Sequence, residues 1–346
     1  MKKNLTKLFA LLLVLSMVTV MFAGCKGNTE PSTDSQASEQ PSSETPSESE
    51  DTEPHDNKVI YGSSTEISGD LGNAWWSNNA TDKLVRDLIN DYDVIVFDQF
   101  GQMKVNETVA ESVTDETDSE GVLTYTVKIK QGLVYNNGTP ITAADYVAYA
   151  LVQLSPATLQ AGATINADTT VGGTAYQKGE SKVLSGVRLI DEYTYSISIP
   201  AEYAQYYYGL TYASLSPLYL PLYSSADLTV KDDGEGAYLD GGELVADEIN
   251  ASRYVYEGRV AAGPYVIKSL DTGALTATLV KNELYAGNFE GQKPSIKTIV
   301  VVKAEDDTMM DAFQTGEITF LSQLSDGDQI ETAMDMVDDG GYSYCH

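Results

Sequence analysis

The first 57 residues limit what this chain can fold into, because they offer little that a packed core could use. Three lysines among the first seven residues precede an apolar run from Leu8 to Ala23. That run is shorter than the about 20 apolar residues that a membrane-spanning helix needs. A basic start, a short apolar stretch and small residues at its end are typical of a secretory signal peptide. We therefore expect residues 1–24 to be a leader rather than part of the fold.

The residues after the apolar run indicate a lipid anchor and a tether. Phe22-Ala23-Gly24-Cys25 resembles the bacterial lipoprotein box, in which the cysteine is acylated, although leucine is usual where Phe22 stands. Ordinary cleavage beside an incidental cysteine is the alternative. Residues 25–57 are rich in Ser, Thr, Glu and Pro, so they cannot bury enough apolar surface to offset their chain entropy. We expect a lipidated Cys25, a disordered tether, and an extracytoplasmic protein anchored to the outer face of the cytoplasmic membrane, as in Gram-positive bacteria.

The part of the chain expected to fold lacks the side chains of most nucleophilic and zinc-dependent catalysis. The cysteines are Cys25 and Cys345, and the histidines are His55 and His346. Ser-His-Asp and Cys-His schemes and most zinc sites need these residue types. We therefore expect no catalytic residue, no metal and no cofactor. The formal net charge of −30 repels phosphate backbones, so nucleic acid is not an expected partner.

Hydrophobic patterns beyond the tether predict a mixed fold of helices and strands. Leu123–Lys130 alternates apolar and polar side chains, as in a strand with one buried face. Asp82–Asn90 places its apolar residues on one helical face, with Thr81 as the expected N-cap. A second helix is expected over Ala143–Leu154, where Asp145 completes a capping box.

Further strands, one more helix and two loops are expected along the rest of the chain. The expected strands are Val59–Tyr61, Val187–Ile199, Tyr265–Lys268, Leu275–Lys281, Ile296–Val302 and Ile318–Leu321. The expected helix, Asp306–Thr315, turns Met309 inward and stops at Gly316. Gly162–Gly179 and the acidic Lys231–Glu257 are expected to be loops, and the acidic one lacks the twelve-residue spacing of a calcium loop.

Several segments, in this order, resemble the family 5 extracellular solute-binding proteins, which serve peptide, dipeptide and nickel importers. The most specific is the strand at 123–132 followed by Tyr135-Asn-Asn-Gly-Thr-Pro-Ile-Thr-Ala-Ala-Asp145, with Asn137 where the family commonly has Asp. Similar later segments are Val187–Tyr195, Gly263–Ser269, Lys281–Tyr285 and Phe313–Ile318. Their order and spacing extend over residues 59–344, with Thr319 where Asp is usual.

The resemblance implies a periplasmic-binding-protein-like class II fold of mixed α and β structure. Such proteins have two lobes that close on a ligand, and the first lobe carries an extra domain. Mapped onto this chain, lobe one comprises residues 58–90 and 182–322, the extra domain residues 91–181, and residues 323–346 the start of a truncated second lobe. The second lobe normally supplies the acidic residue that pairs with a peptide's amino terminus, and no position here inherits that role.

The resemblance also selects two candidate ligand-binding segments. The stretch after the first strand faces the cleft in the family, and the tyrosine-dense segment after residue 200 matches one near the cleft floor. The candidates are Trp75, Trp76 and Asn78 in the first segment and Tyr207, Tyr208 and Tyr212 in the second. Core packing is the alternative for each aromatic residue, since alternate residues of an extended run face opposite sides.

The resemblance implies the solute-binding component of an ABC importer, which captures peptides at the cell surface and delivers them to a membrane permease. Peptide backbones are read by hydrogen bonds, while side chains enter adaptable pockets. The expected partners are a peptide or other small solute, the permease subunits, and the membrane through the lipid. A surface sensor or adhesin with the same fold is one alternative. A secreted glycoside hydrolase with two carboxylates about 5–9 Å apart is the other.

Overall fold

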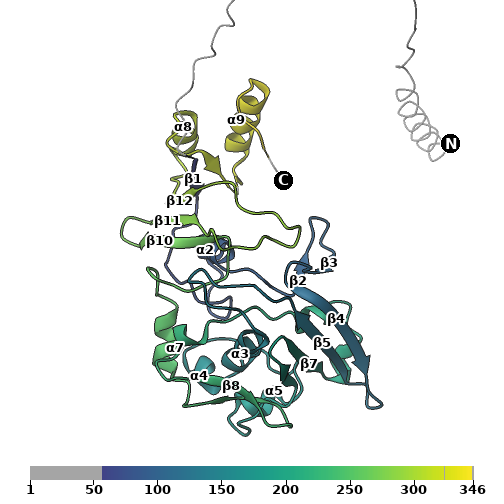
Figure 1. Cartoon of the computed structure of the whole chain (residues 1–346). Helices are drawn as coiled ribbons and strands as arrows, with labels where there is room; N and C mark the ends of the chain where they lie inside the picture. Colours follow the sequence, from purple (N-terminus) through teal and green to yellow (C-terminus); the bar gives the residue numbers. More distant parts are fainter. Residues whose placement is uncertain (1–56, 323, 345–346) are drawn as a thin grey trace, which may run out of the picture. The chain divides into compact units, whose positions relative to one another are not determined.

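The computed structural model describes residues 57–322 and 324–344, and its first large sheet joins strands from both ends of that range (Figure 1). The strands are β1 (Lys58–Ser63), β10 (Tyr265–Asp271), β11 (Thr276–Lys281), β12 (Thr298–Lys303) and β13 (Phe320–Leu321). Their order across the sheet is β10-β11-β12-β1-β13. β1 is parallel to β12 and to β13, whereas β10, β11 and β12 are antiparallel. All five strands were predicted from the sequence, with shifted ends.

Helices pack on both faces of β12. Val85 and Ile89 of α2 (Ala80–Ile89) belong to the same core cluster as Val301 of β12. Val302, one residue further along, packs with Met309 of α8 (Met309–Gln314). Successive side chains of a strand point to opposite faces, so the two helices lie on opposite sides of β12. Met309 is buried, as predicted.

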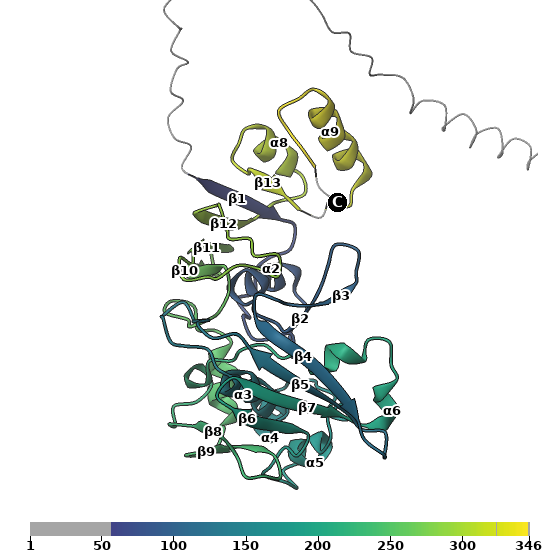
Figure 2. The same cartoon turned by 45° about the vertical axis from the view of Figure 1, so that its right-hand side comes forward.

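The second large sheet is antiparallel throughout and is covered by a helix. Its strands are β4 (Ala110–Thr117), β5 (Leu123–Ile129), β6 (Val187–Asp191) and β7 (Thr194–Ile199), in the order β4-β5-β7-β6. Helix α3 (Ala143–Gln153) lies beside this sheet in both views (Figures 1 and 2). Its Tyr146, Val147 and Leu151 share a core with Val127 and Tyr195 of the strands. The alternating pattern predicted β5 correctly, whereas the single strand expected over Val187–Ile199 is in fact two antiparallel strands, β6 and β7, with a turn at residues 192–193.

The start of α2 differs from the prediction. Asn79 is the N-cap, not Thr81, because its side-chain oxygen accepts the N–H groups of Thr81 and Asp82 at 2.9 and 3.0 Å. Thr81 lies inside the first turn, and its hydroxyl donates to the carbonyl of Thr65 at 2.6 Å. Asparagine is as good a cap as threonine, and the local pattern did not separate the two.

Helix α3 begins with the predicted capping box, in which the N–H of Thr142 donates to the carboxylate of Asp145 at 2.8 Å. The expected end is nearly right, because α3 stops at Gln153. Pro156, expected only to end this helix, also begins α4 (Pro156–Gln160), and Ser155 caps that helix. Proline suits the first helical position because its missing N–H would have no partner there.

Both segments predicted as loops contain regular structure. The elements are α5 (Gly173–Gln177) in the first, and β8 (Thr229–Asp232), β9 (Ala237–Asp240) and α7 (Ala246–Ser252) in or beside the second. A tertiary contact fixes the β8–β9 hairpin, since Arg188 of β6 donates to both carboxylate oxygens of Asp232 at 2.8 and 2.7 Å. The acidic composition alone could not predict this pairing.

The remaining elements are short. They are β2 (Ile95–Phe97), β3 (Met103–Val105), α6 (Ala201–Ala204), the 3-10 helices η1 (Gly209–Ala213) and η2 (Leu220–Leu222), and α9 (Gly327–Asp338). No element was predicted where β2, β3 and β4 lie, because their residues are mostly exposed and show little alternation. Strands from both sides of residue 181 share the second sheet, so the boundary expected there runs between strands that are hydrogen-bonded to each other.

The predicted leader, the lipidated Cys25 and the tether up to residue 56 lie outside the described residues. Within residues 57–322 and 324–344, no helix has the length and apolar character that crossing a bilayer requires. The residues expected to begin a second lobe include α9.

Tyr195 carries a hydroxyl that its surroundings do not satisfy. The side chain is fully buried and stacks on Tyr146 at 5.7 Å, and its hydroxyl has no hydrogen-bond partner among the described residues. A buried polar group without a partner costs about 1 to 3 kcal/mol. Tyr195→Phe is therefore expected to leave the free energy of unfolding unchanged or raise it by about 1 kcal/mol in urea denaturation.

Tyr146→Phe is the matched control for this prediction. The hydroxyl of Tyr146 donates to the carbonyl of Tyr92 at 2.9 Å, so its removal is expected to lower the free energy of unfolding by about 1 kcal/mol. Equal losses in the two variants would contradict the assignment of Tyr195 as the unsatisfied group.

Candidate ligand-binding site

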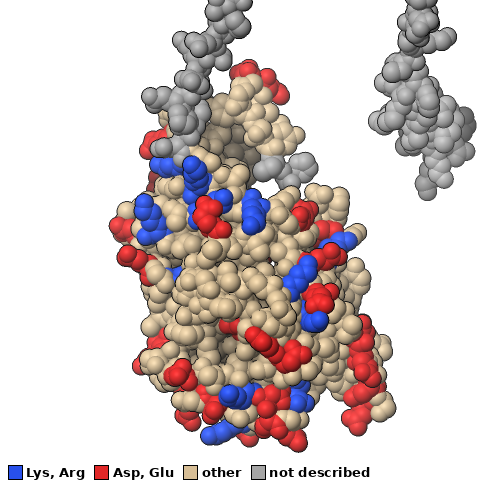
Figure 3. Space-filling view, viewed as in Figure 1, with Lys and Arg blue, Asp and Glu red and all other residues tan. Residues whose placement is uncertain are grey.

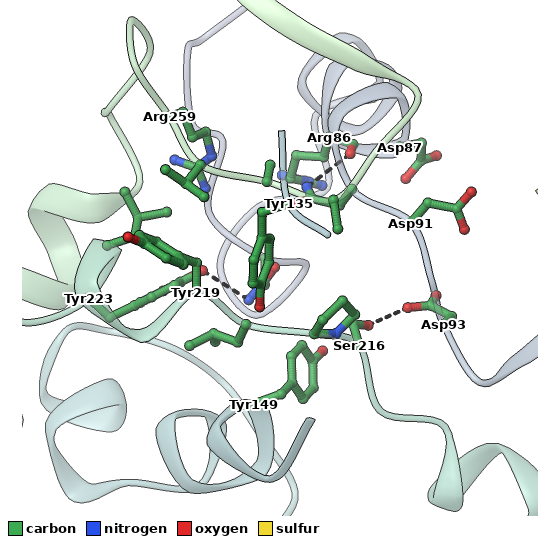
Figure 4. Close-up of a pocket in the computed structure, with 18 of the residues that line it drawn as sticks. Arg86, Asp87, Asp91, Asp93, Tyr135, Tyr149, Ser216, Tyr219, Tyr223 and Arg259 are labelled. Carbon is green, nitrogen blue, oxygen red and sulfur yellow. Dashed lines mark hydrogen bonds between the residues drawn. The ribbon is translucent and has the colours of Figure 1, made fainter. Parts of the chain in front are cut away.

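A cavity of about 220 Å³ lies beside α2, where the helix meets residues 216–223 and 259–262 (Figure 4). Its lining combines tyrosines with side chains of both charges. These residues are Tyr135, Tyr149, Tyr219, Tyr223, Lys83, Arg86, Arg259, Asp87, Asp91 and Asp93. Ligand sites in proteins are typically concave, with apolar and aromatic walls and a few polar groups. The cavity beside α2 has this composition.

The end of α2 positions the acidic side of the cavity. Asp91 and Asp93 flank Tyr92, a buried residue in the left-handed region at φ +71°. The ring of Tyr92 stacks on Tyr285 at 5.4 Å, and its hydroxyl accepts the N–H of Ala286 at 2.7 Å. These contacts hold the strained residue in place and leave both neighbouring aspartates at the cavity.

The environment of each aspartate alters its acidity. Burial raises the pKa of Asp91, even though the hydroxyl of Tyr285 donates to its carboxylate. Loss of bulk water around the carboxylate, together with the charges of Asp91 and Asp87, raises the pKa of Asp93 to about 6, although the residue lies at the exposed rim. The hydroxyl of Ser216 donates to Asp93 (Figure 4).

The basic side of the cavity holds two buried arginines. Arg259 is 4 % exposed, and its terminal nitrogens donate to the carbonyls of Ser252 and Leu71 at 2.7 and 2.9 Å. Its Nε–H has no acceptor among the described residues, and burial lowers the pKa of Arg259. Arg86 donates to the carbonyls of Asp70 and Ser77 at 3.3 and 3.1 Å. Within the described part of the chain, neither guanidinium forms a salt bridge with a carboxylate.

The predicted tryptophans lie next to the cavity lining rather than in it. Trp75 is 7 % exposed and packs edge-on against Tyr149, a lining residue, at 5.3 Å. Trp76 donates from its indole N–H to the carbonyl of Ala161 at 3.1 Å, and the guanidinium of Arg253 lies 4.9 Å from its ring centre. Trp75 and Trp76 are thus held by the fold, and their contact with ligand stays a prediction. Asn78 is exposed.

The predicted tyrosines form a separate surface, which we call the aromatic cluster. Its members are Phe97, Tyr203, Tyr206, Tyr207, Tyr208 and Tyr212. Tyr207 is 77 % exposed and meets Tyr208 at 4.8 Å, and Tyr212 stacks on Tyr206 at 6.1 Å. None of these residues lines the cavity. Exposed apolar patches often mark interaction sites, so this surface is a second candidate for contact with a solute.

Acidic side chains are spread over the face shown in Figure 3 rather than gathered in one patch. A dispersed negative charge keeps a protein soluble and needs no charged partner to explain it. The local charges of the cavity are therefore more informative than the net charge.

None of the six candidate residues from the sequence lines the cavity, and the residues that do line it were not among the candidates. Asp91 and Asp93 stand in a short Asp-Tyr-Asp run after a helix, and Arg259 is a single charge beside the apolar residues 260–262. The one signal in the sequence that could have indicated these lining residues is the position of single charged residues directly beside apolar segments. Their convergence depends on tertiary packing, which no local pattern reports.

Comparisons with known proteins place the chain in a family. The model of the bacterial extracellular solute-binding proteins, family 5 Middle, matches residues 104–343. No curated protein matches the chain. Many solved structures do, and the likeness confirms the predicted mixed α/β fold of the class II periplasmic-binding-protein kind.

Three of these solved structures illustrate the likeness. OppA of Burkholderia pseudomallei has a TM-score of 0.56 at 16 % identity over 82 % of this chain and 49 % of its own. Haemophilus influenzae OppA in complex with RPPGFSPFR has a TM-score of 0.58 at 16 % identity, over 81 % and 48 %. Closed lactococcal OppA with an endogenous peptide has a TM-score of 0.58 at 17 % identity, over 81 % and 47 %.

This chain spans about half the length of the solved structures that it matches. The family model itself covers more than half of the chain, including the second sheet, α3 and α8. The chain belongs to the bacterial extracellular solute-binding proteins of family 5.

Proposed function

We propose that this protein captures peptides outside the cell and delivers them to the permease of an ABC importer, without performing a reaction. Membership of a family of solute-binding proteins supports the capture of a solute. Two structural neighbours, the OppA proteins of Haemophilus influenzae and of a lactococcus, hold peptides. The observation in this chain that carries the proposal is the cavity beside α2, where aromatic walls meet groups of both charges.

Removing an aromatic wall of the cavity should weaken peptide binding. Tyr219 lines the cavity and packs edge-on against Tyr135 at 5.3 Å. In calorimetric titrations of the full chain with a mixture of short peptides, Tyr219→Ala is expected to bind at least about tenfold more weakly, since an aromatic contact contributes about 0.5 to 1.5 kcal/mol beyond its buried area. Ile190→Ala, an exposed residue of β6 outside the cavity, is the control and should bind normally.

The aromatic cluster is proposed as the surface that meets the side chains of a longer peptide. Four of its six rings, those of Phe97, Tyr206, Tyr207 and Tyr208, are exposed, and neighbouring rings of the cluster contact one another. These rings can therefore cover apolar side chains of a peptide without rearranging. Tyr207→Ala is included in the same titrations and is expected to reduce affinity about two- to tenfold, as for one aromatic contact. Failure of the wild-type chain to bind any peptide would contradict the proposed function.

We further propose that Cys25 carries the lipid that holds the protein at the membrane. The basic start, the apolar run and the lipoprotein-box sequence support this. Metabolic labelling with an alkyne fatty acid is expected to mark the wild-type protein and to fail with Cys25→Ala. Cys345→Ala is the matched control and should stay labelled. Undiminished label on Cys25→Ala would contradict the anchor.

A further inference from the structure

A surface groove separate from the cavity lies between the β2–β3 hairpin and residues 287–292. Its volume is about 360 Å³, and no residue lines both the groove and the cavity. Its walls include two phenylalanines, three acidic residues and one lysine, which are Phe100, Phe289, Asp98, Glu107, Glu290 and Lys104. The hairpin extends past the second sheet in both views, so it is open to a partner (Figures 1 and 2). The capture of a solute in the cavity does not use this groove.

Turns on both sides hold the groove in shape. The carboxylate of Asp98 accepts the N–H of Phe100 at 2.9 Å, and the side chain of Asn288 accepts the N–H of Glu290 at 3.0 Å. Aspartate and asparagine stabilise turns in this way. The hydroxyl of Thr108 donates to the carbonyl of Asn288 at 2.6 Å, which joins the two segments. The groove is therefore formed before any partner arrives.

Two phenylalanine rings form the apolar walls. Phe100 is 78 % exposed, and Phe289 is half-buried. Within the described part of the chain, neither ring contacts another aromatic ring or has a cation over its face. The face of an aromatic ring is negative in its electrostatics and attracts cations. These walls suit a group that is positively charged and can lie flat on a ring.

The charges of the groove leave two carboxylates without a cation. Lys104 lies 3.6 Å from Asp98 and is already paired with it. The carboxylates of Glu107 and Glu290 form no salt bridge among the described residues. Lys130 donates to the backbone carbonyl of Glu107 and not to its carboxylate. The two glutamates come from the two opposite segments, so a cation in the groove has a carboxylate on each side.

We propose that this groove binds an arginine side chain displayed by a partner polypeptide, with its guanidinium against Phe100 and Phe289 and its donors directed to Glu107 and Glu290. A guanidinium is planar, stacks on aromatic faces and is weakly hydrated, whereas the ammonium of lysine is compact and strongly hydrated. Its five N–H donors are enough for both carboxylates.

The size and the openness of the groove indicate a side chain on a polypeptide rather than an enclosed small molecule. At about 30 Å³ per water, about 360 Å³ corresponds to about twelve waters, which leaves room for the aliphatic stem and the flanking backbone. Most of the lining side chains are exposed. An arginine that stands on a protein surface therefore reaches the groove without an entry path.

The test is fluorine NMR of the full chain labelled with para-fluorophenylalanine. The chain has seven phenylalanines, so the signals are few, and Phe100→Leu and Phe289→Leu assign those of the groove. Titration with N-acetyl-arginine methylamide is expected to shift both signals. The citrulline analogue has the same shape without the charge and is expected to bind at least about fivefold more weakly. Equal binding of the two compounds, or no shift with either, would overturn the proposal.

Variants of the two glutamates test their role. Glu107→Gln and Glu290→Gln remove a charge but keep an acceptor oxygen, and each is expected to weaken binding of the arginine compound about two- to fivefold, as for an exposed charge pair. Glu243→Gln, an exposed residue outside the groove, is the control and should bind normally. Undiminished binding by the variant with both glutamates replaced would overturn the assignment of the carboxylates.

The source of the arginine is tested with a blocked pentapeptide that has one arginine among alanines, beside free arginine. The pentapeptide is expected to bind at least as tightly as free arginine and to shift the same two signals. Tyr219→Ala, which alters the cavity, is expected to leave this binding unchanged. Binding of free arginine alone would overturn the polypeptide partner. Loss of pentapeptide binding in Tyr219→Ala would assign it to the cavity and overturn the groove, while peptide capture would stand.

Discussion

Replacing Arg253 with methionine is expected to lower the free energy of unfolding by about 3 to 5 kcal/mol, because it leaves a buried carboxylate without its ion partner. Arg253 donates from Nε and from a terminal nitrogen to the two oxygens of Asp70 at 3.0 and 2.6 Å. The side chains are 14 % and 6 % exposed. Urea denaturation followed by circular dichroism measures the change.

A second arginine–aspartate pair in this chain provides the matched control. Arg188 holds Asp232 with the same two-point geometry, at 2.8 and 2.7 Å, but this pair is less buried, with side chains 36 % and 11 % exposed. Arg188→Met is expected to cost about 1 kcal/mol or less, as surface pairs do. If Arg253→Met and Arg188→Met lowered the free energy of unfolding equally, the burial of the Arg253–Asp70 pair would not explain the loss.

The acidity of Asp70 sets the pH dependence of this effect. Burial raises the pKa of Asp70, but the hydrogen bonds from Arg253 and Gly72 and the positive charges of Arg253 and Arg86 outweigh it, so the pKa lies below its usual value. A carboxyl group with a lowered pKa in the folded state stabilises the fold above its unfolded pKa, and this contribution is lost as the pH falls through the folded pKa. The difference between wild type and Arg253→Met should therefore be largest near neutral pH and shrink below about pH 4.

Arg253 also connects this pair to the tryptophans beside the cavity. Its guanidinium lies 4.9 Å from the ring centre of Trp76, and the indole N–H of Trp76 donates a hydrogen bond to the carbonyl of Ala161. Loss of the arginine should thus change tryptophan fluorescence in the folded protein as well as its stability. A change in both signals would link the fold of residues 70–76 to the candidate site.

The elements that could be predicted from the sequence are those whose signals are local. β5 follows from alternation within seven residues, and the start of α3 from a cap and its partner three positions on. The order of family-like segments predicted the fold class, since the spacing of such segments reflects the topology. These inferences needed no knowledge of which segments meet in space.

The parts that could not be predicted depend on contacts between distant segments. The β8–β9 hairpin lies in an acidic stretch and is fixed by Arg188, a residue of another strand. The cavity brings Asp93, Ser216 and Arg259 together from three parts of the chain. The six candidate residues were selected by type and by resemblance, and type alone did not separate the buried Trp75 from the exposed Tyr207.

Asp82→Ala is expected to lower the free energy of unfolding by about 3 kcal/mol or more, because it leaves two backbone N–H groups without an acceptor at about 1 to 3 kcal/mol each. Asp82 is completely buried in the first turn of α2. One carboxylate oxygen accepts the N–H groups of Ser68 and Gly69 at 2.9 and 3.0 Å, and the other accepts the hydroxyl of Ser68. Thermal and urea denaturation measure the loss.

The same helix contains the control for this prediction. Asp87 lies on its exposed side and pairs with Lys83 one turn earlier, so Asp87→Ala should cost about 0.5 kcal/mol or less. Asp82→Asn keeps one acceptor oxygen and is expected to fall between the two alanine variants. Ser68 and Gly69, whose N–H groups donate to Asp82, begin the loop that continues to Trp75 beside the cavity. Asp82→Ala should therefore also weaken peptide binding. A loss as small as that of Asp87→Ala would mean that the loop at Ser68 and Gly69 does not need this carboxylate.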